Sequence, residues 1–340
     1  MLEIAKNVSL LNHNTLGVAA QAYAYSAIDS DGDLRDALQY AEQHGLPSLV
    51  LGGGSNIVLS DDYPGLVIHM RQRGISASPI EGGVALRVTA GENWDALLRY
   101  CLDQGWYGLE NLIAIPGSVG AAPVQNIGAY GVELSHCLAW VEGWDRRLGE
   151  RRRLSAEQCQ LAYRDSIFKG ALRDQFIITE VGLHLRHCAH ANTDYPALRQ
   201  FLVEHGESPE KVHPRIVAQA VAAIRAAKLP DVHAEPNAGS FFKNPLVSAD
   251  LAKQLLIDFP EMAHWPMPDG QVKLAAAWLV DQCGWKGRRL GPVGVHPKQA
   301  IVLVNYQQGR GEDILALADA IIGDVARRFG VQLAIEPRVY

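Results

Sequence analysis

The stretch "LVLGGGSNIVLS", Leu49 to Ser60, is the most informative in the chain, because two apolar runs flank Gly52-Gly53-Gly54-Ser55-Asn56. Three consecutive glycines remove every Cβ, so a ligand can approach the backbone closely and φ can become positive. Exposed N–H groups in such a turn form a concave site for an anion, typically phosphate. No Lys-Ser/Thr follows, and the spacing is not GxGxxG. A phosphate cradle and a tight turn between two strands are therefore equal alternatives.

The composition bounds the class of protein. The chain has 340 residues, of which 48% are hydrophobic and 20% charged, so it can build two or three globular domains. Its net charge is −6 and no basic face is evident, which argues against nucleic acid as the main partner. No apolar run approaches the ~20 residues of a membrane helix, and the start does not resemble a signal peptide. We expect a cytoplasmic protein with no membrane partner.

Cysteine usage agrees with that compartment. The five cysteines, Cys101, Cys137, Cys159, Cys188 and Cys283, include no CxxC pair, which is typical of reduced thiols. The stretch "HLRHCAH" holds His184, His187, Cys188 and His190, but its spacing fits no zinc pattern. We expect no metal site.

Strands and helices alternate from the amino end, which favours an α+β or α/β arrangement. Asp33 is predicted to be the N-cap of a helix that ends near His44, with Gly45 following. Asn93 is predicted to cap a helix that Gly105 ends. Strands are predicted at 65–70 and 84–91.

A second unusual stretch, "GLENLIAIPGSVGAAPVQNIGAYGVE", runs from Gly108 to Glu133. It is rich in small residues but too apolar for a disordered linker. Small side chains let the backbone pack against a flat partner, which is either another part of the protein or a bound cofactor. We favour the cofactor, because the length without periodicity exceeds that of an ordinary loop.

The remaining elements follow from the same signals. Residues 134–145 are predicted to form a hairpin with 149–154, whose arginines we interpret as a solvated face. Ser155 and Gln158 form a capping-box pattern for a short helix. Further elements are predicted as a strand at 175–186, helices at 215–230, 249–257, 272–284 (ended by Gly284) and 312–329, and strands at 299–306 and 331–340. Ser248 is the predicted N-cap of the second of these helices, and a domain boundary is expected near 190–215.

Three polar residues lie where packing does not require them: Arg164 in "AYRDS", Ser240 in "NAGSFFKNP" and Glu336 in "LAIEP". Each also has a structural explanation, namely a salt bridge to Asp165, a turn hydroxyl and a solvent-facing strand position. No nucleophile–base pair, G-x-S-x-G, H-E-x-x-H or acidic metal cluster is present. The absence of such groups favours a cofactor that supplies the chemistry.

Taken together, the motifs resemble one enzyme family. "LGGGSN", "IPGSVGAAPVQNIGAYGVE", "YRDSIFK", "KLPD", "NAGSFFKNP" and "IEPRV" occur in this order in the UDP-N-acetylenolpyruvoylglucosamine reductases. The resemblance covers nearly the whole chain, and the segment around Tyr195 is similar to the longer form, which carries a tyrosine-bearing loop over the substrate. One departure is "NTLG", where Leu16 replaces an expected aromatic residue.

The resemblance implies an α+β fold with an FAD-binding domain of the vanillyl-alcohol-oxidase type and a smaller α+β substrate-binding domain. The expected bounds are 1–205 for the FAD-binding region, with lobes of about 1–70 and 71–205. The substrate domain would be 206–340, with the last strand reaching back to the active site. The implied partners are UDP-N-acetylglucosamine enolpyruvate and NADPH, and we expect a monomer.

The resemblance also implies roles for single residues. The catalytic positions match Arg164, Ser240 and Glu336. The FAD pyrophosphate contacts match Gly53, Gly54, Ser55 and Asn56, and the flavin-lining positions match Ser118, Gly120, Gly128 and Ala129. The positions around the UDP-sugar match Tyr195, Arg225, Lys228, Asn244 and Gln299.

The implied reaction is NADPH-dependent reduction of an enol ether, which gives UDP-N-acetylmuramate for peptidoglycan synthesis. Negative charge that develops beside the substrate carboxylate needs a cation, which Arg164 supplies, and a general acid, which Ser240 supplies. Glu336 helps only if it is protonated, which apolar neighbours favour. Two alternatives remain, a flavin oxidase on the same fold and a non-catalytic sugar-nucleotide binding protein.

Overall fold

The computed structural model describes residues 2–340, and these residues form two compact units that are interleaved along the chain. Unit 1 comprises the described part of Met1–Asn7 together with Tyr23–Gly53 and Pro64–Ala227. Unit 2 comprises Val8–Ala22, Gly54–Tyr63 and Lys228–Tyr340. The domain boundary expected between residues 205 and 206 stays a prediction.

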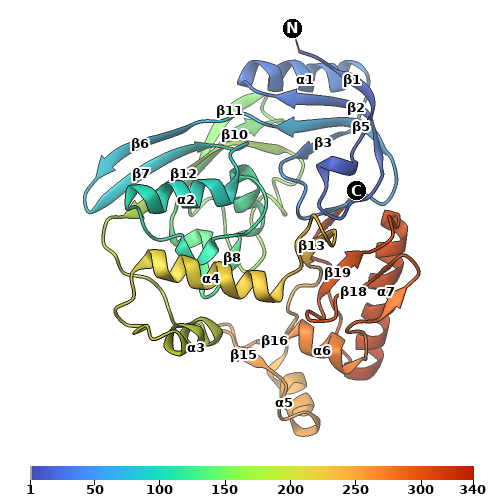
Figure 1. Ribbon diagram of the computed structural model, residues 1–340. Helices are drawn as coiled ribbons and strands as arrows, with labels where there is room; N and C mark the ends of the chain where they lie inside the picture. Colours follow the sequence, from blue (N-terminus) through green and yellow to red (C-terminus); the bar gives the residue numbers. More distant parts are fainter. Residues whose placement is uncertain (1) are drawn as a thin grey trace. The chain divides into compact units, whose positions relative to one another are not determined.

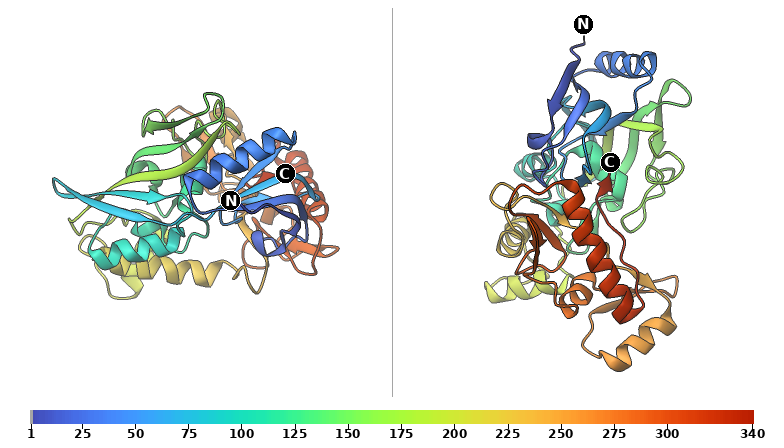
Figure 2. Two further views of the ribbon diagram at one scale, coloured as in Figure 1. Left: turned by 90° about the horizontal axis from the view of Figure 1, so that it is seen from above. Right: turned by 90° about the vertical axis from the view of Figure 1, so that its right-hand side faces the viewer.

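The first sheet of unit 1 has the strand order β1-β2-β5-β3, and helix α1 lies across it (Figures 1 and 2). The bounds are β1 Ala5–Ser9, β2 Gln21–Ile28, β5 Tyr63–Met70, β3 Ser48–Leu51 and α1 Asp31–Gln43. Helix α1 buries Leu34, Ala37 and Ala41 in the same apolar cluster as Ile28 and Ile68. The helix is therefore held to the sheet by one apolar face.

The second sheet of unit 1 is antiparallel and has the order β11-β10-β12-β7-β6 (Figure 1). The bounds are β11 Glu150–Ser155, β10 Leu138–Asp145, β12 Phe176–Arg186, β7 Gly83–Thr89 and β6 Ile75–Ile80. Asp145 pairs with Glu150, so the predicted hairpin between β10 and β11 is confirmed.

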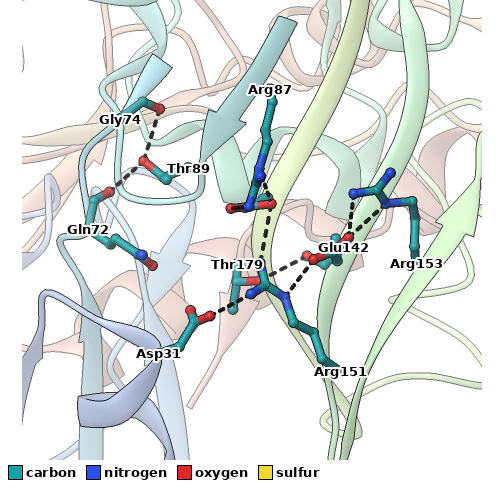
Figure 3. Close-up of polar contacts among 10 residues, drawn as sticks. Asp31, Gln72, Gly74, Arg87, Thr89, Glu142, Arg151, Arg153 and Thr179 are labelled. Atoms are coloured by element: carbon teal, nitrogen blue, oxygen red, sulfur yellow. Dashed lines mark hydrogen bonds and ion pairs between the residues drawn. The ribbon is translucent and has the colours of Figure 1, made fainter. Parts of the chain in front are cut away.

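The arginines of the β10–β11 hairpin form ion pairs with acidic side chains. Arg151 lies between three carboxylates, at 2.5 Å from Glu142, 3.2 Å from Glu180 and 2.6 Å from Asp31. Figure 3 shows its contacts with Asp31 and Glu142. Asp31 opens α1, so this network ties that helix to the second sheet. The interpretation of a merely solvated face was incomplete, because the acidic partners are distant in sequence.

The helices of unit 1 pack around these sheets. Their bounds are α2 Trp94–Gln104, α3 Pro196–Glu204 and α4 Pro214–Lys228. Lys228, the last residue of α4, belongs to unit 2. Unit 1 also has a short pair of strands, β8 Gly128–Ala129 and β9 Val132–Glu133. The predicted caps of α2 are confirmed, since Asn93 accepts from the Ala96 N–H and Gly105 has φ +74°. None of the helices within residues 2–340 has the length and apolar character needed to cross a bilayer.

Unit 2 contains three small sheets with the orders β13-β19-β18-β17, β14-β16-β15 and β20-β4, and α7 packs on β18 of the first of them (Figures 1 and 2). The strand bounds are β13 Asn237–Ser240, β19 Val302–Asn305, β18 Val293–Val295, β17 Arg289–Leu290, β14 Leu246–Val247, β16 Val272–Leu274, β15 His264–Pro266, β20 Arg338–Val339 and β4 Ile57–Val58. The helices are α5 Ala249–Asp258, α6 Ala276–Gln282 and α7 Gly311–Phe329. Ser248 caps α5 as predicted.

Two predicted helix starts were wrong. The N-cap of α1 is Ser30, whose hydroxyl accepts from the Asp33 N–H at 3.1 Å, so the helix starts earlier than expected. Ser155 and Gln158 do exchange the two capping-box hydrogen bonds, at 2.9 and 3.2 Å. No helix follows, because Gln160 adopts φ +49° and ends the turn.

Two predicted elements of unit 2 were too long. The helix expected over 272–284 begins at Ala276, because residues 272–274 form the central strand of a sheet. The strand expected over 331–340 is reduced to Arg338–Val339 and an isolated bridge at Ile335. Pro337 lies between these pairings and has no N–H to donate to a ladder.

We predict that Asp145→Asn lowers the free energy of unfolding by about 1–3 kcal/mol, because the buried carboxylate accepts from the side chain of Arg152 at 2.6 Å and the backbone of Arg147 at 3.1 Å. Burial alone would raise the pKa of Asp145, but these hydrogen bonds lower it below its ordinary value. A depressed pKa stabilises the fold above about pH 4, and this contribution is lost as the pH falls through the folded-state pKa.

The measurement is urea unfolding of both proteins at pH 7 and at acidic pH. The difference between them should be largest at pH 7 and should shrink in acid. Asp103→Asn is the matched control, because Asp103 also pairs with an arginine but its side chain is 71% exposed. Equal effects of the two substitutions would contradict the prediction.

Candidate functional site

Unit 1 contains a cavity of about 370 Å³ beside the first glycine-rich loop. Two segments form its glycine wall, Gly52-Gly53 and Gly117-Ser118. The remaining lining residues are Asp29, His69, Met70, Arg71, Arg73, Gly91 and Asn93. Of the residues predicted to bind a cofactor, Gly53 and Ser118 lie here.

The two segments of the wall approach each other so closely that side chains are excluded. A Cβ on Gly53 would lie 2.9 Å from the Gly117 Cα, and a Cβ on Gly52 would collide with the Ser118 hydroxyl. Real Cβ atoms essentially never come within 3.0 Å of another heavy atom in this way. Backbone N–H groups exposed along such a wall can face an anion directly, which fits a pyrophosphate group.

Cationic side chains line the same cavity. Arg71 is held by Asp29 through two hydrogen bonds, at 3.3 and 2.9 Å, and Arg73 is held by Glu92 at 3.2 Å. The Thr89 hydroxyl donates to the Gln72 carbonyl at 2.9 Å (Figure 3). The short loop that carries both arginines is therefore fixed on the second sheet, and each guanidinium group is paired with a carboxylate.

The rest of the first glycine-rich loop belongs to unit 2. Gly54 has φ +62°, and a Cβ there would collide with the His13 carbonyl, so Gly54 is required by backbone packing. The Gly54 carbonyl accepts from the Thr15 N–H, and the Asn56 carbonyl accepts from the Arg338 N–H. The loop is not a hairpin turn between its neighbours, since β3 pairs with β5 and β4 pairs with β20.

The second glycine-rich stretch packs closely on the second sheet. Gly120 donates to the Ala90 carbonyl at 2.9 Å, and a Cβ on it would lie 2.5 Å from the Ala90 Cβ. Buried Asn126 holds the following loop by donating to Glu133 at 2.7 Å and accepting from Ser135 at 3.0 Å. Part of the stretch is therefore packed against protein, and the packing sets the position of Gly128 and Ala129.

Arg164 lies in a two-residue turn and adopts φ +53°. Its Nη2 donates to the Gly128 carbonyl at 2.9 Å, and Ser166 donates to the Val124 carbonyl at 2.6 Å. A non-glycine residue in this conformation costs free energy and is common at functional sites. The turn therefore fixes a guanidinium group beside the glycine-rich loop, which suits stabilisation of negative charge.

Tyr130, Tyr195 and Arg225 are neighbours in unit 1. The tyrosine rings meet edge to face with centroids 5.2 Å apart, and Arg225 donates to the Ala114 carbonyl at 3.3 Å. Burial lowers the pKa of Arg225 and raises the pKa of Tyr130. Tyr195 itself is 42% exposed, so it can contact a ligand.

Ser240 and Glu336 lie on adjacent segments of unit 2. Ser240 ends β13 opposite Val302, and the next residue, Phe241, accepts from the Glu336 N–H at 2.9 Å. Backbone pairing thus brings together two segments that are far apart in sequence. Arg164 belongs to unit 1.

Three other residues predicted to contact the substrate, Asn244, Gln299 and Lys228, belong to unit 2. The Asn244 side chain accepts from the Ala276 N–H at 2.9 Å, which caps α6. The Gln299 carbonyl accepts from the Val302 N–H at 3.1 Å, and Lys228 is exposed at the end of α4. The capping role of Asn244 was not predicted, because its partner is distant in sequence.

Several lining residues of the cavity were missed by the sequence analysis, namely Asp29, His69, Arg71, Arg73 and Asn93. A usable signal existed, because Asp29 follows β2, and His69 and Arg71 lie at the end of β5. Neighbouring strands of a sheet that end at the same edge bring such polar residues together. Tyr130 was also missed, although it is the one aromatic residue in "NIGAYG".

Two family models match the chain. Residues 23–155 match "FAD binding domain", and residues 231–340 match "UDP-N-acetylenolpyruvoylglucosamine reductase, C-terminal domain". The glycine wall and the arginines of the cavity fit the pyrophosphate of FAD. The predicted cofactor and the predicted FAD-binding fold with a further α+β domain are confirmed.

Curated relatives match over the full length. The UDP-N-acetylenolpyruvoylglucosamine reductase of Pseudomonas fluorescens (strain Pf0-1) is 46% identical over 340 residues, which is 100% of this chain and 99% of the relative. That of Shewanella sp. (strain ANA-3) is 46% identical over 331 residues, 97% of this chain and 95% of the relative. The crystal structure of the enzyme from Thermus caldophilus has a TM-score of 0.68 at 24% identity and covers 100% of this chain and 99% of that one, which shows the same fold.

Proposed function

Because the chain belongs to the UDP-N-acetylenolpyruvoylglucosamine reductase family, we propose that it reduces UDP-N-acetylglucosamine enolpyruvate to UDP-N-acetylmuramate with NADPH as reductant. This is a step of peptidoglycan precursor synthesis, which we place in the cytoplasm. The observation that carries the proposal is the match of residues 231–340 to the C-terminal domain of that reductase. An FAD-binding domain alone serves many reactions, whereas the model that matches residues 231–340 is named for this reductase.

The proposed cofactor contacts are those implied by the resemblance, Gly53, Gly54, Ser55, Asn56, Ser118, Gly120, Gly128 and Ala129. Support comes from Gly53 and Ser118, which line one cavity. When bound and reduced by NADPH, FAD would supply a hydride to the methylene carbon of the enol ether. The proposed contacts with the UDP-sugar are Tyr195, Arg225, Lys228, Asn244 and Gln299.

The proposed roles of the three catalytic residues follow from the charge that the reaction creates. Arg164 stabilises the negative charge beside the substrate carboxylate, and its fixed turn supports a preorganised role. The Ser240 hydroxyl then donates its proton to the adjacent carbon as a general acid. Glu336, which we propose is protonated, donates a further hydrogen bond to the same charge.

The test is a visible spectrum of the purified protein. We expect a yellow protein whose flavin absorbance is bleached by NADPH without oxygen, and restored by UDP-N-acetylglucosamine enolpyruvate. UDP-N-acetylglucosamine, which lacks the enolpyruvyl group, is the control and should leave the bleached spectrum unchanged. Protein that NADPH does not bleach, or that the substrate does not restore, would refute the proposal.

The same experiment separates the two alternatives. A flavin oxidase would regain its absorbance rapidly in air without the sugar nucleotide. A non-catalytic binding protein would bind the sugar nucleotide without oxidising NADPH. The match to the reductase C-terminal domain favours the reductase over both.

A further inference from the structure

Strand β13 contains one extra residue just before Ser240. Asn237 lies opposite Val304 on the neighbouring strand β19 (Figure 1). Ser240 lies opposite Val302, so three steps along β13 match two steps along β19. Gly239 has φ +70°, as the first residue of one common class of β-bulge does. Because successive side chains of a strand point to opposite faces, this bulge decides which face of the sheet the Ser240 side chain takes.

The Asn237 side chain holds the bulge in this shape. It is 2% exposed, and its Oδ1 accepts from the Gly239 N–H at 2.8 Å. Its Nδ2 donates to the Glu235 carbonyl at 2.7 Å and to the Pro230 carbonyl at 3.4 Å. Turning the amide over would place its oxygen against two carbonyls, so these contacts fix its direction. One buried amide therefore joins the bulge to the chain that leads into β13.

Gly239 is required by its conformation and not by lack of space. Among residues 2–340, apart from its chain neighbours, no atom would lie within 4 Å of a Cβ at this position. A positive φ is unfavourable for a residue that has a Cβ. The glycine and the Asn237 side chain therefore favour the same backbone shape immediately before Ser240.

The chain that follows Ser240 is fixed by backbone pairing. The Phe241 N–H donates to the Ile301 carbonyl at 2.7 Å, and the Phe241 carbonyl accepts from the Glu336 N–H at 2.9 Å. The Phe241 side chain is fully buried. Ser240 is thus held between a paired segment on one side and the bulge on the other. The bulge is the part of this arrangement that a single side chain controls.

We propose that Asn237 is a positioning residue for Ser240: its amide holds the bulge, and the bulge directs the Ser240 hydroxyl toward the carbon that receives its proton. This inference rests on the proposed function. A general acid must lie within hydrogen-bond reach of its acceptor, and a displacement of about 1 Å can cost about 10²-fold in rate. The expected effect is on the step that uses the Ser240 proton, because Asn237 acts only through the backbone.

The test uses stopped-flow absorbance of the FAD-loaded enzyme and the variant Asn237→Ala. Restoration of the flavin absorbance by UDP-N-acetylglucosamine enolpyruvate should slow by about tenfold to a hundredfold. NADPH should bleach the flavin at the wild-type rate. Asn237→Ser keeps an oxygen that can accept from the Gly239 N–H, so it should slow restoration less than Asn237→Ala does. An unchanged rate of restoration in Asn237→Ala, or equal slowing of both half-reactions, would overturn the inference.

Asn305→Ala is the matched control for loss of a buried asparagine. Asn305 is 3% exposed, and its side chain also accepts from a glycine N–H, that of Gly309, at 2.6 Å. It donates to the carbonyls of Gly309 and Leu16, each at 3.0 Å. The variant therefore loses hydrogen bonds of the same kinds away from the bulge. Both half-reactions should keep their wild-type rates, and slowing of restoration as large as in Asn237→Ala would count against positioning.

Gly239→Ala tests the same bulge if Asn237→Ala does not fold. The added methyl group meets open space, so the substitution acts only through the positive φ. It should slow restoration of the flavin absorbance by a similar factor. Gly284→Ala is its control, because Gly284 has φ +75° after α6 and also faces open space. A wild-type rate of restoration in Gly239→Ala would refute a role of the bulge.

A double-mutant cycle with Ser240→Ala shows whether Asn237 acts through Ser240. Adding Asn237→Ala to Ser240→Ala should not slow restoration further, because the hydroxyl that the bulge directs is already absent. Further slowing by the full factor of the single variant would overturn the inference.

The wild-type enzyme distinguishes this failure from failure of the proposed function. Wild-type protein whose flavin does not respond to NADPH and the sugar nucleotide would refute the proposed function. Active wild-type protein, slowed by Ser240→Ala but not by the Asn237 and Gly239 variants, would refute the positioning role alone.

Discussion

Ser240→Ala is expected to slow restoration of the flavin absorbance by UDP-N-acetylglucosamine enolpyruvate by about 10²–10⁴-fold, the usual contribution of a general acid. NADPH should bleach the flavin of the variant at the wild-type rate, because that step does not need the Ser240 proton. Ser240 ends β13, beside the segment that carries Glu336, so losing its hydroxyl removes one proton donor without disturbing the strand pairing. Stopped-flow absorbance of the two half-reactions measures both rates.

Ser248→Ala is the matched control for this prediction. It removes a serine hydroxyl from unit 2 as well, but Ser248 caps α5. Loss of that cap costs about 1 kcal/mol of stability and should leave both half-reactions unchanged. Equal slowing of both half-reactions in Ser240→Ala, or of neither, would show that Ser240 is not the proton donor.

Local signals in the sequence were read correctly where the partner lies within a few residues. Asn93 and Ser248 cap their helices, and Gly105 and Gly284 have positive φ at helix ends, as predicted. The hairpin of β10 and β11 was also predicted from adjacent residues. In each case a side chain or turn interacts with the backbone beside it, so the sequence signal for the cap or turn lies within a few consecutive residues.

Contacts between distant segments could not be predicted in this way. Asn244 caps a helix that begins at Ala276, and Phe241 pairs with Glu336. Arg151 reaches Asp31 at the start of α1. The cavity also depends on distant segments, since Gly53 and Gly117 are far apart in sequence and meet only in the tertiary structure. A close approach of two backbone segments requires a glycine, but the glycine in the sequence does not indicate which segment it contacts.

Gly53→Val is expected to weaken FAD binding on the order of tenfold to a hundredfold, so that the purified variant loses much of its yellow colour. A Cβ at this position would lie 2.9 Å from the Gly117 Cα, which is backbone and cannot rotate away. The two segments of the glycine wall must then move apart, at a cost of about 1–3 kcal/mol. Quenching of FAD fluorescence on titration of the apoprotein measures the Kd.

Gly170→Val is the matched control, because it makes the same substitution in unit 1 at a glycine that also lacks positive φ. The nearest atoms to a Cβ there are carbonyl oxygens at 3.8 and 3.9 Å, which is ordinary van der Waals contact. This variant should bind FAD as the wild type does. If Gly53→Val also kept its FAD affinity, the wall of Gly52-Gly53 and Gly117-Ser118 would not be the pyrophosphate site.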